Sequence, residues 1–225
     1  MSNEYNIPAT VIPGRLEVYT GPMNSGKSKA LIDRLYSFQR QSEIIPFPID
    51  VFKPSADTRD KGYIATRAFG GAQVPAKLFR TNYPTDILDM MAQGKGLVAI
   101  DEAQFVFPDQ IAAGSARLRD VVDELRRKQK HVLVGGLSLD FRGEVFGDMG
   151  YLALSADIVH HLNAICHCGA IATRTQRYVG EKPNLRPAHY TDPISMPGDK
   201  EYAAVCHEHH IVPGKPGSDL SDRIK

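Results

Sequence analysis

Eight consecutive residues near the start of the chain have the spacing of a loop that holds phosphate groups. Residues 21 to 28 read GPMNSGKS and fit the pattern G-x-x-x-x-G-K-[ST]. Glycines at both ends of the pattern let the backbone curl, so that successive N–H groups point inward toward an anion. The lysine can then reach the β- and γ-phosphates of a nucleotide, and the last hydroxyl can bind Mg²⁺. We therefore expect ATP and Mg²⁺ to bind at this segment, which comprises Gly21, Pro22, Met23, Asn24, Ser25, Gly26, Lys27 and Ser28.

Two adjacent carboxylates follow an apolar stretch later in the chain. Residues 97 to 100 read LVAI, and Asp101 and Glu102 come directly after them. A phosphate loop needs an acid at the end of a neighbouring strand to hold the metal, and Asp101 is the expected acid. Glu102 could serve as a general base for an attacking hydroxyl or water. On the local sequence alone, a helix-capping role for Glu102 stays open.

Strands and helices must alternate to position these groups. Residues 16 to 20 predict a strand before the glycine-rich segment, and residues 29 to 40 predict a helix, because apolar residues recur at 31, 32, 35 and 38. Further buried strands are expected at 49–53, 97–100 and 131–137, with helical patterns around 86–92 and 112–130. This alternation predicts an α/β fold with a parallel sheet covered on both faces.

The composition is that of a folded globular protein. The chain has 225 residues, of which 42% are apolar and 24% charged, and a formal net charge of +1. A near-neutral surface argues against nucleic acid as a partner. The first residues, MSNEYNIPAT, lack the pattern of a secretory signal, and no apolar run approaches the roughly eighteen residues of a membrane span. We expect a cytoplasmic protein that does not interact with a membrane.

All three cysteines lie late in the chain. Cys166, Cys168 and Cys206 are an odd number and cannot form a disulfide framework among themselves, which makes a metal site with a different fourth ligand plausible. Residues 169 to 205 contain four prolines and are too long for an ordinary connection, so a functional or disordered segment is expected there. Residues 211 to 225 have the pattern of a loose tail, to which no function is assigned.

Four motifs together resemble the zinc-containing (type II) thymidine kinase family over roughly residues 15 to 212. They are GPMNSGKS at 21–28, DEAQF at 101–105, GLSLDFRGEVFG at 136–147 and LNAICHCGAIATRTQR at 162–177. The resemblance implies transfer of the ATP γ-phosphoryl group to the 5′-hydroxyl of thymidine, giving dTMP and ADP, by a homotetramer. It also implies an N-terminal extension at 1–14, a RecA-like ATP-binding domain at 15–164, a zinc-binding lasso domain at 165–212 and a flexible tail at 213–225.

The resemblance also implies roles for single residues. Glu102 becomes the general base and Asp101 the acid on the Mg²⁺ side, with Ala103 and Gln104 beside them at the nucleotide. The residues implied at the nucleoside are Met23, Phe105, Phe141, Ile194, Ser195, Met196, Pro197 and Tyr202. Without the resemblance, Phe105 and Phe141 would be interpreted as core residues. The family often has an apolar residue followed by two glycines where this chain has Met196, Pro197 and Gly198. Pro197 lacks an N–H, so a nucleoside kinase of different base specificity stays an alternative.

The zinc ligands implied by the resemblance are Cys166, Cys168, Cys206 and His209. Three thiolates and one imidazole suit a structural Zn²⁺. His167, His207 and His210 are close enough in sequence to compete, but the C-x-x-H spacing and the family position favour His209. Such a site would hold both ends of the long segment between the cysteines.

Two other classes of protein share parts of this pattern. An ATP-driven nucleic-acid motor also has a phosphate loop and a D-E-A-x motif, but it needs a second motor lobe, for which 225 residues leave no room. A protein that binds zinc and nucleotide only for structure gives no reason for the paired Asp101 and Glu102. The basic residues at 126–130 are interpreted as a solvated helix end.

Overall fold

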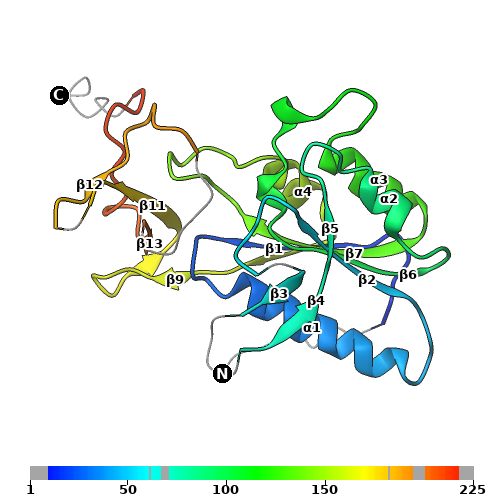
Figure 1. Cartoon of the computed structure of the whole chain (residues 1–225). Helices are drawn as coiled ribbons and strands as arrows, with labels where there is room; N and C mark the ends of the chain where they lie inside the picture. The colour runs from blue at the N-terminus through cyan, green and yellow to red at the C-terminus, as the bar shows by residue number, and fades with distance from the viewer. Residues whose placement is uncertain (1–9, 61, 67–70, 182, 195–200, 218–225) are drawn as a thin grey trace.

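A parallel β-sheet forms the centre of the structure (Figure 1). The structure is a computed structural model that describes residues 10–60, 62–66, 71–181, 183–194 and 201–217. Six strands pair in the order β5-β2-β6-β7-β1-β8, and every neighbouring pair is parallel. Their bounds are β1 Leu16–Gly21, β2 Ile49–Pro54, β5 Lys77–Phe79, β6 Gly96–Ile100, β7 Lys130–Leu137 and β8 Ile158–His161. The predicted α/β fold is confirmed.

Helices cover both faces of this sheet, so its central strands are buried along their length (Figure 1). On one face lie α1 (Lys27–Ser42) and the hairpin of β3 (Tyr63–Ala65) and β4 (Gln73–Pro75). On the other lie α2 (Asp86–Met90), α3 (Leu118–Arg127) and α4 (Met149–Ser155). Successive residues of β1 alternate between the two cores, Val18 facing α3 and α4 and Tyr19 facing α1.

The helix after the glycine-rich loop follows its predicted pattern. The apolar residues at 31, 32, 35 and 38 of α1 are all fully buried against the sheet. Burying each such side chain stabilises the fold by about 1.5–3 kcal/mol. The helix predicted at 112–130 begins later, at Leu118, because Gly114 has a φ of +83° that a right-handed helix excludes.

A second, smaller set of strands follows β8. The hairpin of β9 (Ala164–Ile165) and β10 (Ile171–Ala172) lies beside an antiparallel sheet in the order β12-β11-β13. The bounds of that sheet are β11 Arg174–Val179, β12 Arg186–Pro187 and β13 Tyr202–Val205. Its core is small and includes two of the three cysteines. No helix among the described residues is long and apolar enough to cross a membrane.

Candidate active site and metal centre

The glycine-rich loop connects β1 to α1 at the carboxyl edge of the sheet. Gly21 has a φ of +152°, and a Cβ there would lie 2.0 Å from the Leu162 carbonyl oxygen, so only glycine fits. Asn24 and Gly26 also have positive φ angles, which gives the loop its curl. Lys27 folds over the loop, because its Nζ donates to Pro22 O at 2.6 Å and to Ser25 Oγ at 3.3 Å. Burial lowers the pKa of Lys27 to about 8, against the opposing effect of the Glu102 and Asp101 carboxylates.

Asp101 and Glu102 follow β6 at the same edge. The Ser28 hydroxyl donates to Asp101 Oδ2 at 3.1 Å, so the two groups expected at the metal lie side by side. Burial and the neighbouring Glu102 charge raise the pKa of Asp101 to about 7. Glu102 has a φ of +53° and makes no side-chain capping hydrogen bond to the short helix η1 (Ala103–Phe105) that follows. The geometry therefore gives no support to the capping role.

Both oxygens of the Glu102 carboxylate are held by neighbouring side chains. Arg59 Nη2 donates to Glu102 Oε1 at 2.7 Å, and Gln104 Nε2 donates to Glu102 Oε2 at 2.5 Å. Gln104 itself is anchored, since its Oε1 accepts from the Leu137 N–H at 3.0 Å. These bonds fix the direction of the carboxylate at the edge of the sheet.

Arg59 and Asp57 were missed by the sequence analysis. Arg59 Nε donates to Asp57 Oδ1 at 2.8 Å, and Lys53 Nζ lies 3.1 Å from Asp57 Oδ2. Burial alone would lower the pKa of Arg59, but Asp57 and Glu102 raise it above its ordinary value, so the guanidinium stays charged. The available signal was their place directly after a parallel strand, β2, whose carboxyl end lies beside that of β6.

A cavity of about 340 Å³ opens over these groups. Its lining combines the phosphate loop with the charged residues after β2 and β6, and includes Met23, Lys27, Ser28, Asp57, Arg59, Asp101, Glu102 and Leu137. Cationic side chains, loop N–H groups and metal-binding oxygens thus surround one space. This arrangement suits a nucleotide triphosphate with its metal.

A second, apolar pocket adjoins the first. It is lined by Met23, Phe105, Leu137, Leu139, Asp140, Phe141, Phe146, Thr175, Ile194 and Tyr202. The structure thus brings together Met23, Phe105, Phe141, Ile194 and Tyr202, five residues expected at the nucleoside. Ser195, Met196 and Pro197 lie outside the described residues. Phe146 was missed although it lies within the GLSLDFRGEVFG motif, and its ring packs edge-on against Phe105 at 6.1 Å between centroids.

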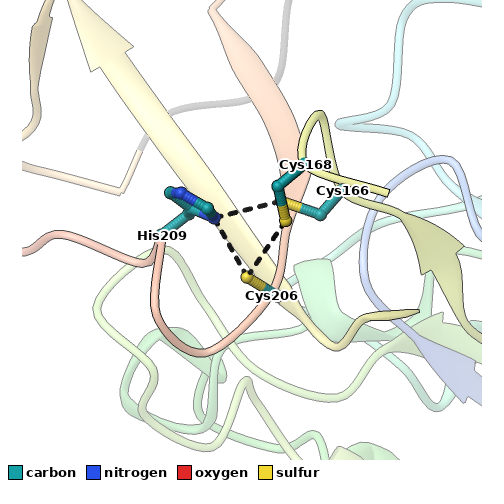
Figure 2. Close-up of side chains that lie close together, drawn as sticks. All are labelled: Cys166, Cys168, Cys206 and His209. Atoms are coloured by element: carbon teal, nitrogen blue, oxygen red, sulfur yellow. Dashed lines mark hydrogen bonds between the residues drawn. The ribbon is translucent and has the colours of Figure 1, made fainter. Parts of the chain in front are cut away.

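The three cysteines and His209 form a compact cluster (Figure 2). Their ligand atoms all lie within 4.8 Å of one another. The Sγ atoms of Cys168 and Cys206 are 3.9 Å apart, and His209 Nδ1 lies 3.1 Å from Cys206 Sγ and 3.6 Å from Cys166 Sγ. Ligands of tetrahedral zinc at Zn–S distances of 2.3 Å would be about 3.8 Å apart, so the donor set fits Zn²⁺.

The histidines that compete with His209 have other positions. The His167 ring contacts the His209 ring in a tilted arrangement, with 4.4 Å between centroids, and its Nδ1 is 3.6 Å from Cys166 Sγ. His210 turns away and donates through Nε2 to Phe141 O at 2.9 Å. Within the described residues, the group that could hold a metal contains His209 and none of its competitors.

The phosphate loop, the acid pair and the adjoining apolar pocket on a parallel sheet define a phosphotransferase that uses a nucleoside triphosphate. The family model for thymidine kinase matches residues 14–210. A curated relative named thymidine kinase, from Coprothermobacter proteolyticus, is 42% identical over 206 residues, which cover 90% of this chain and 93% of the relative. The chain belongs to the thymidine kinase family.

Proposed function

We propose that the 340 Å³ cavity holds the phosphates of ATP and that thymidine binds at the apolar pocket, whose free volume of about 10 Å³ must widen as the substrate enters. The enzyme transfers the γ-phosphoryl group of ATP to the 5′-hydroxyl of thymidine, giving dTMP and ADP. The observation that carries this assignment is that Met23 and Leu137 line both spaces. A nucleoside in the apolar pocket would therefore have its hydroxyl next to the terminal phosphate, and such positioning is the main requirement of phosphoryl transfer.

Lys27, Ser28 and Asp101 act on the nucleotide side of this reaction. The Lys27 ammonium offsets the negative charge of the phosphates, and loop N–H groups orient them. Ser28 Oγ and Asp101 Oδ2, 3.1 Å apart, are two oxygen ligands of the kind that Mg²⁺ prefers. Bound Mg²⁺ would supply positive charge to the transferring group.

Glu102 is the base that accepts the proton of the 5′-hydroxyl. Each of its two oxygens accepts one hydrogen bond from the protein, from Arg59 or from Gln104. A carboxylate oxygen has a second lone pair, so either one can still accept a bond from a substrate hydroxyl. Arg59 and Gln104 orient the carboxylate before the substrate arrives, which lowers the cost of reorganisation.

Zn²⁺ bound by Cys166, Cys168, Cys206 and His209 has a structural role. The cluster joins the β9–β10 hairpin to the end of β13, and so holds both ends of the lasso. A closed four-ligand set leaves no position for substrate, as is typical of structural zinc. We place the ATP-binding domain at 15–164 and the lasso domain at 165–212, with an N-terminal extension at 1–14 and a tail at 213–225. The homotetramer and the cytoplasmic location are further proposals that rest on the family resemblance.

An acceptor assay tests the function directly. ADP formation is measured with thymidine, other deoxynucleosides or single-stranded DNA as the only added acceptor, with the Glu102→Gln protein as the matched blank. We expect ADP and dTMP to form in equal amounts with thymidine. ADP formed only with another deoxynucleoside would change the base specificity, and ADP formed only with DNA would indicate a motor.

A further inference from the structure

The chain after His209 folds back against the small antiparallel sheet (Figure 1, red). We call residues 210–215 the C-terminal brace. Gln176 of β11 donates through Nε2 to Ile211 O at 3.0 Å and accepts through Oε1 from the Ile211 N–H at 2.8 Å. The Tyr190 N–H donates to Pro213 O at 2.8 Å. These three bonds hold the brace against the small antiparallel sheet.

Two side chains of the brace bond to consecutive backbone carbonyls of the pocket loop, residues 139–146. His210 Nε2 donates to Phe141 O at 2.9 Å, and Lys215 Nζ donates to Arg142 O at 2.6 Å. Gly143 allows this approach, because a Cβ there would lie 3.2 Å from Lys215 Nζ and 3.3 Å from His210 Cε1. The brace therefore lies directly on the outer surface of the pocket loop.

The inner side of the same loop shapes the apolar pocket. Four of its residues line that pocket, namely Leu139, Asp140, Phe141 and Phe146. Within the loop, Asp140 Oδ1 accepts from the N–H groups of Arg142 at 2.8 Å and Glu144 at 3.0 Å. The loop satisfies these N–H donors by itself, whereas the carbonyls of Phe141 and Arg142 receive their hydrogen bonds from the brace.

The pocket loop and β11 in turn hold residues 192 and 193 of the lasso. Arg142 Nη2 donates to Asp192 O at 2.8 Å, and Arg177 Nη1 of β11 donates to Pro193 O at 2.5 Å. Both guanidinium groups also lie near the Phe141 ring, at 5.2 Å for Arg142 and 5.6 Å for Arg177. The next lasso residue, Ile194, lines the pocket. A shift of the Arg142 backbone would therefore disturb two walls of the pocket.

We propose that His210 and Lys215 are positioning residues for the nucleoside. Through the Phe141 and Arg142 carbonyls and the Glu144 carboxylate, which lies 3.1 Å from Lys215 Nζ, the brace sets the shape of the thymidine pocket without touching the substrate. The inference rests on the proposed assignment of the apolar pocket to thymidine. No residue of the brace or the pocket loop is among those that line the ATP cavity in the described part of the chain. The brace should therefore affect one substrate and not the other.

Lys215→Met tests the proposal, because it keeps the length of the side chain and removes its three N–H donors. The Lys215 side chain is 33% exposed, so the substitution leaves the core intact. We expect the thymidine KM to rise about three- to tenfold, as for a partly exposed charge-assisted hydrogen bond, with the ATP KM and kcat within about twofold of the wild type. Lys215→Arg should restore most of the thymidine affinity. Lys95→Met, at an exposed lysine directly before β6, is the matched control and should change neither KM.

Zinc content and melting temperature distinguish positioning from folding. An unchanged zinc content together with a selective rise in the thymidine KM supports the proposal. Loss of zinc from the Lys215→Met protein, or equal rises in both KM values, would show a role in folding and overturn the proposal. An unchanged thymidine KM would also overturn the proposal. Phe141→Ala tests the assignment of the apolar pocket independently of the brace. If Phe141→Ala leaves the thymidine KM unchanged, the pocket is not the nucleoside site, and both the proposed function of the pocket and the role of the brace fail.

Discussion

Among single residues, Glu102 combines a strained backbone with a carboxylate that is held on both oxygens. A non-glycine residue at a φ of +53° costs free energy, of order 1–3 kcal/mol, and such strain is concentrated at functional sites. Here the strained backbone places the carboxylate against Arg59 and Gln104 at the cavity, where it makes no cap. The strain and the two hydrogen bonds are best explained by a need for one carboxylate direction.

Glu102→Gln tests the role of base. The amide keeps the size of the side chain and can still hydrogen-bond the hydroxyl, but it cannot take its proton. We expect kcat to fall about 100-fold or more, with thymidine and Mg·ATP affinities changed little. Binding constants and single-turnover rates measure the two effects separately. Asp101→Asn is the comparison and should weaken Mg²⁺ binding as well as lower the rate. Normal turnover by the Glu102→Gln protein would show that Glu102 is not the base.

At the scale of secondary-structure elements, the cysteine-histidine cluster links segments that have little apolar contact with each other. It connects a two-stranded hairpin to the end of β13, and the apolar core between them is small. Short strands with so little buried apolar surface cannot offset the conformational entropy of a long loop by themselves. A metal bound by this cluster would add the missing free energy.

We expect about one Zn²⁺ per chain, by the ligand count of a closed structural site. His209→Ala should lose the metal, because His209 Nδ1 is the nitrogen that faces Cys166 and Cys206. His167→Ala and His207→Ala are matched controls and should keep it. Metal analysis of the purified proteins decides the assignment, and a zinc-free His167→Ala protein beside a zinc-loaded His209→Ala protein would show that the fourth ligand is His167.

A buried charge network joins β1 to the elements packed around it. Glu17, fully buried on β1, accepts from Arg34 of α1 at 2.7 Å and contacts His131 Nε2 of β7 at 3.1 Å. Tyr19 Oη donates to Glu17 Oε2 at 3.2 Å, and His160 Nε2 of β8 lies 3.9 Å from the same oxygen. Burial alone would raise the pKa of Glu17, but His131, His160 and Arg34 outweigh it and hold the pKa below its ordinary value. The carboxylate therefore stays charged inside the sheet.

The sign of the pH effect follows from this lowered pKa. Stability from Glu17 is fully present above the ordinary pKa of 4.5 and is lost as the pH falls below it. Glu17→Gln should lower the free energy of unfolding at pH 7 by about 3 kcal/mol, because it removes the negative charge that faces the largely buried Arg34 guanidinium, and should flatten the loss of stability below pH 4.5. Asp33→Asn, which breaks the exposed pair with Lys29, is the control and should cost less than about 1 kcal/mol. Urea unfolding across pH checks both, and equal acid sensitivity of wild type and Glu17→Gln would contradict the assignment.

In the whole molecule, the two proposed substrate sites are built from different parts of the chain but share a wall. Met23 belongs to the phosphate loop, and its N–H donates to Thr175 Oγ1 of β11 at 3.0 Å. This bond ties the phosphate loop to the small antiparallel sheet. The lasso domain contributes Thr175, Ile194 and Tyr202 to the apolar pocket. In the described part of the chain it contributes no residue to the lining of the 340 Å³ cavity.

Tyr202→Ala should therefore separate the two substrates. Tyr202 is half-buried and lines the apolar pocket but is not among the residues that line the 340 Å³ cavity in the described part of the chain, and loss of an aromatic contact with the substrate weakens binding by about 1–3 kcal/mol. We expect the thymidine KM to rise about tenfold or more while the ATP KM changes less than about threefold. Steady-state kinetics with each substrate varied in turn measure this. Equal rises in both constants would indicate a structural tyrosine.

The sequence by itself determined the parts of this protein that depend on local spacing. The curl of residues 21–28, the buried face of α1 and the acids after β6 each follow from neighbouring residues, because helix and loop geometry repeat over short distances. The cysteines at 166, 168 and 206 also indicated a metal site, since a C-x-C pair and a third cysteine have few other uses in such a chain.

Only the tertiary structure decided which distant groups meet. Arg59 reaches Glu102 because β2 and β6 are neighbours in the sheet, although 43 positions separate the two residues in the chain. The contact of Lys215 with the pocket loop spans 73 positions. Such contacts depend on strand order and on how one layer packs against another, and no local periodicity encodes them. The direction of the Glu102 side chain was settled in the same way, by partners that the fold brings to it.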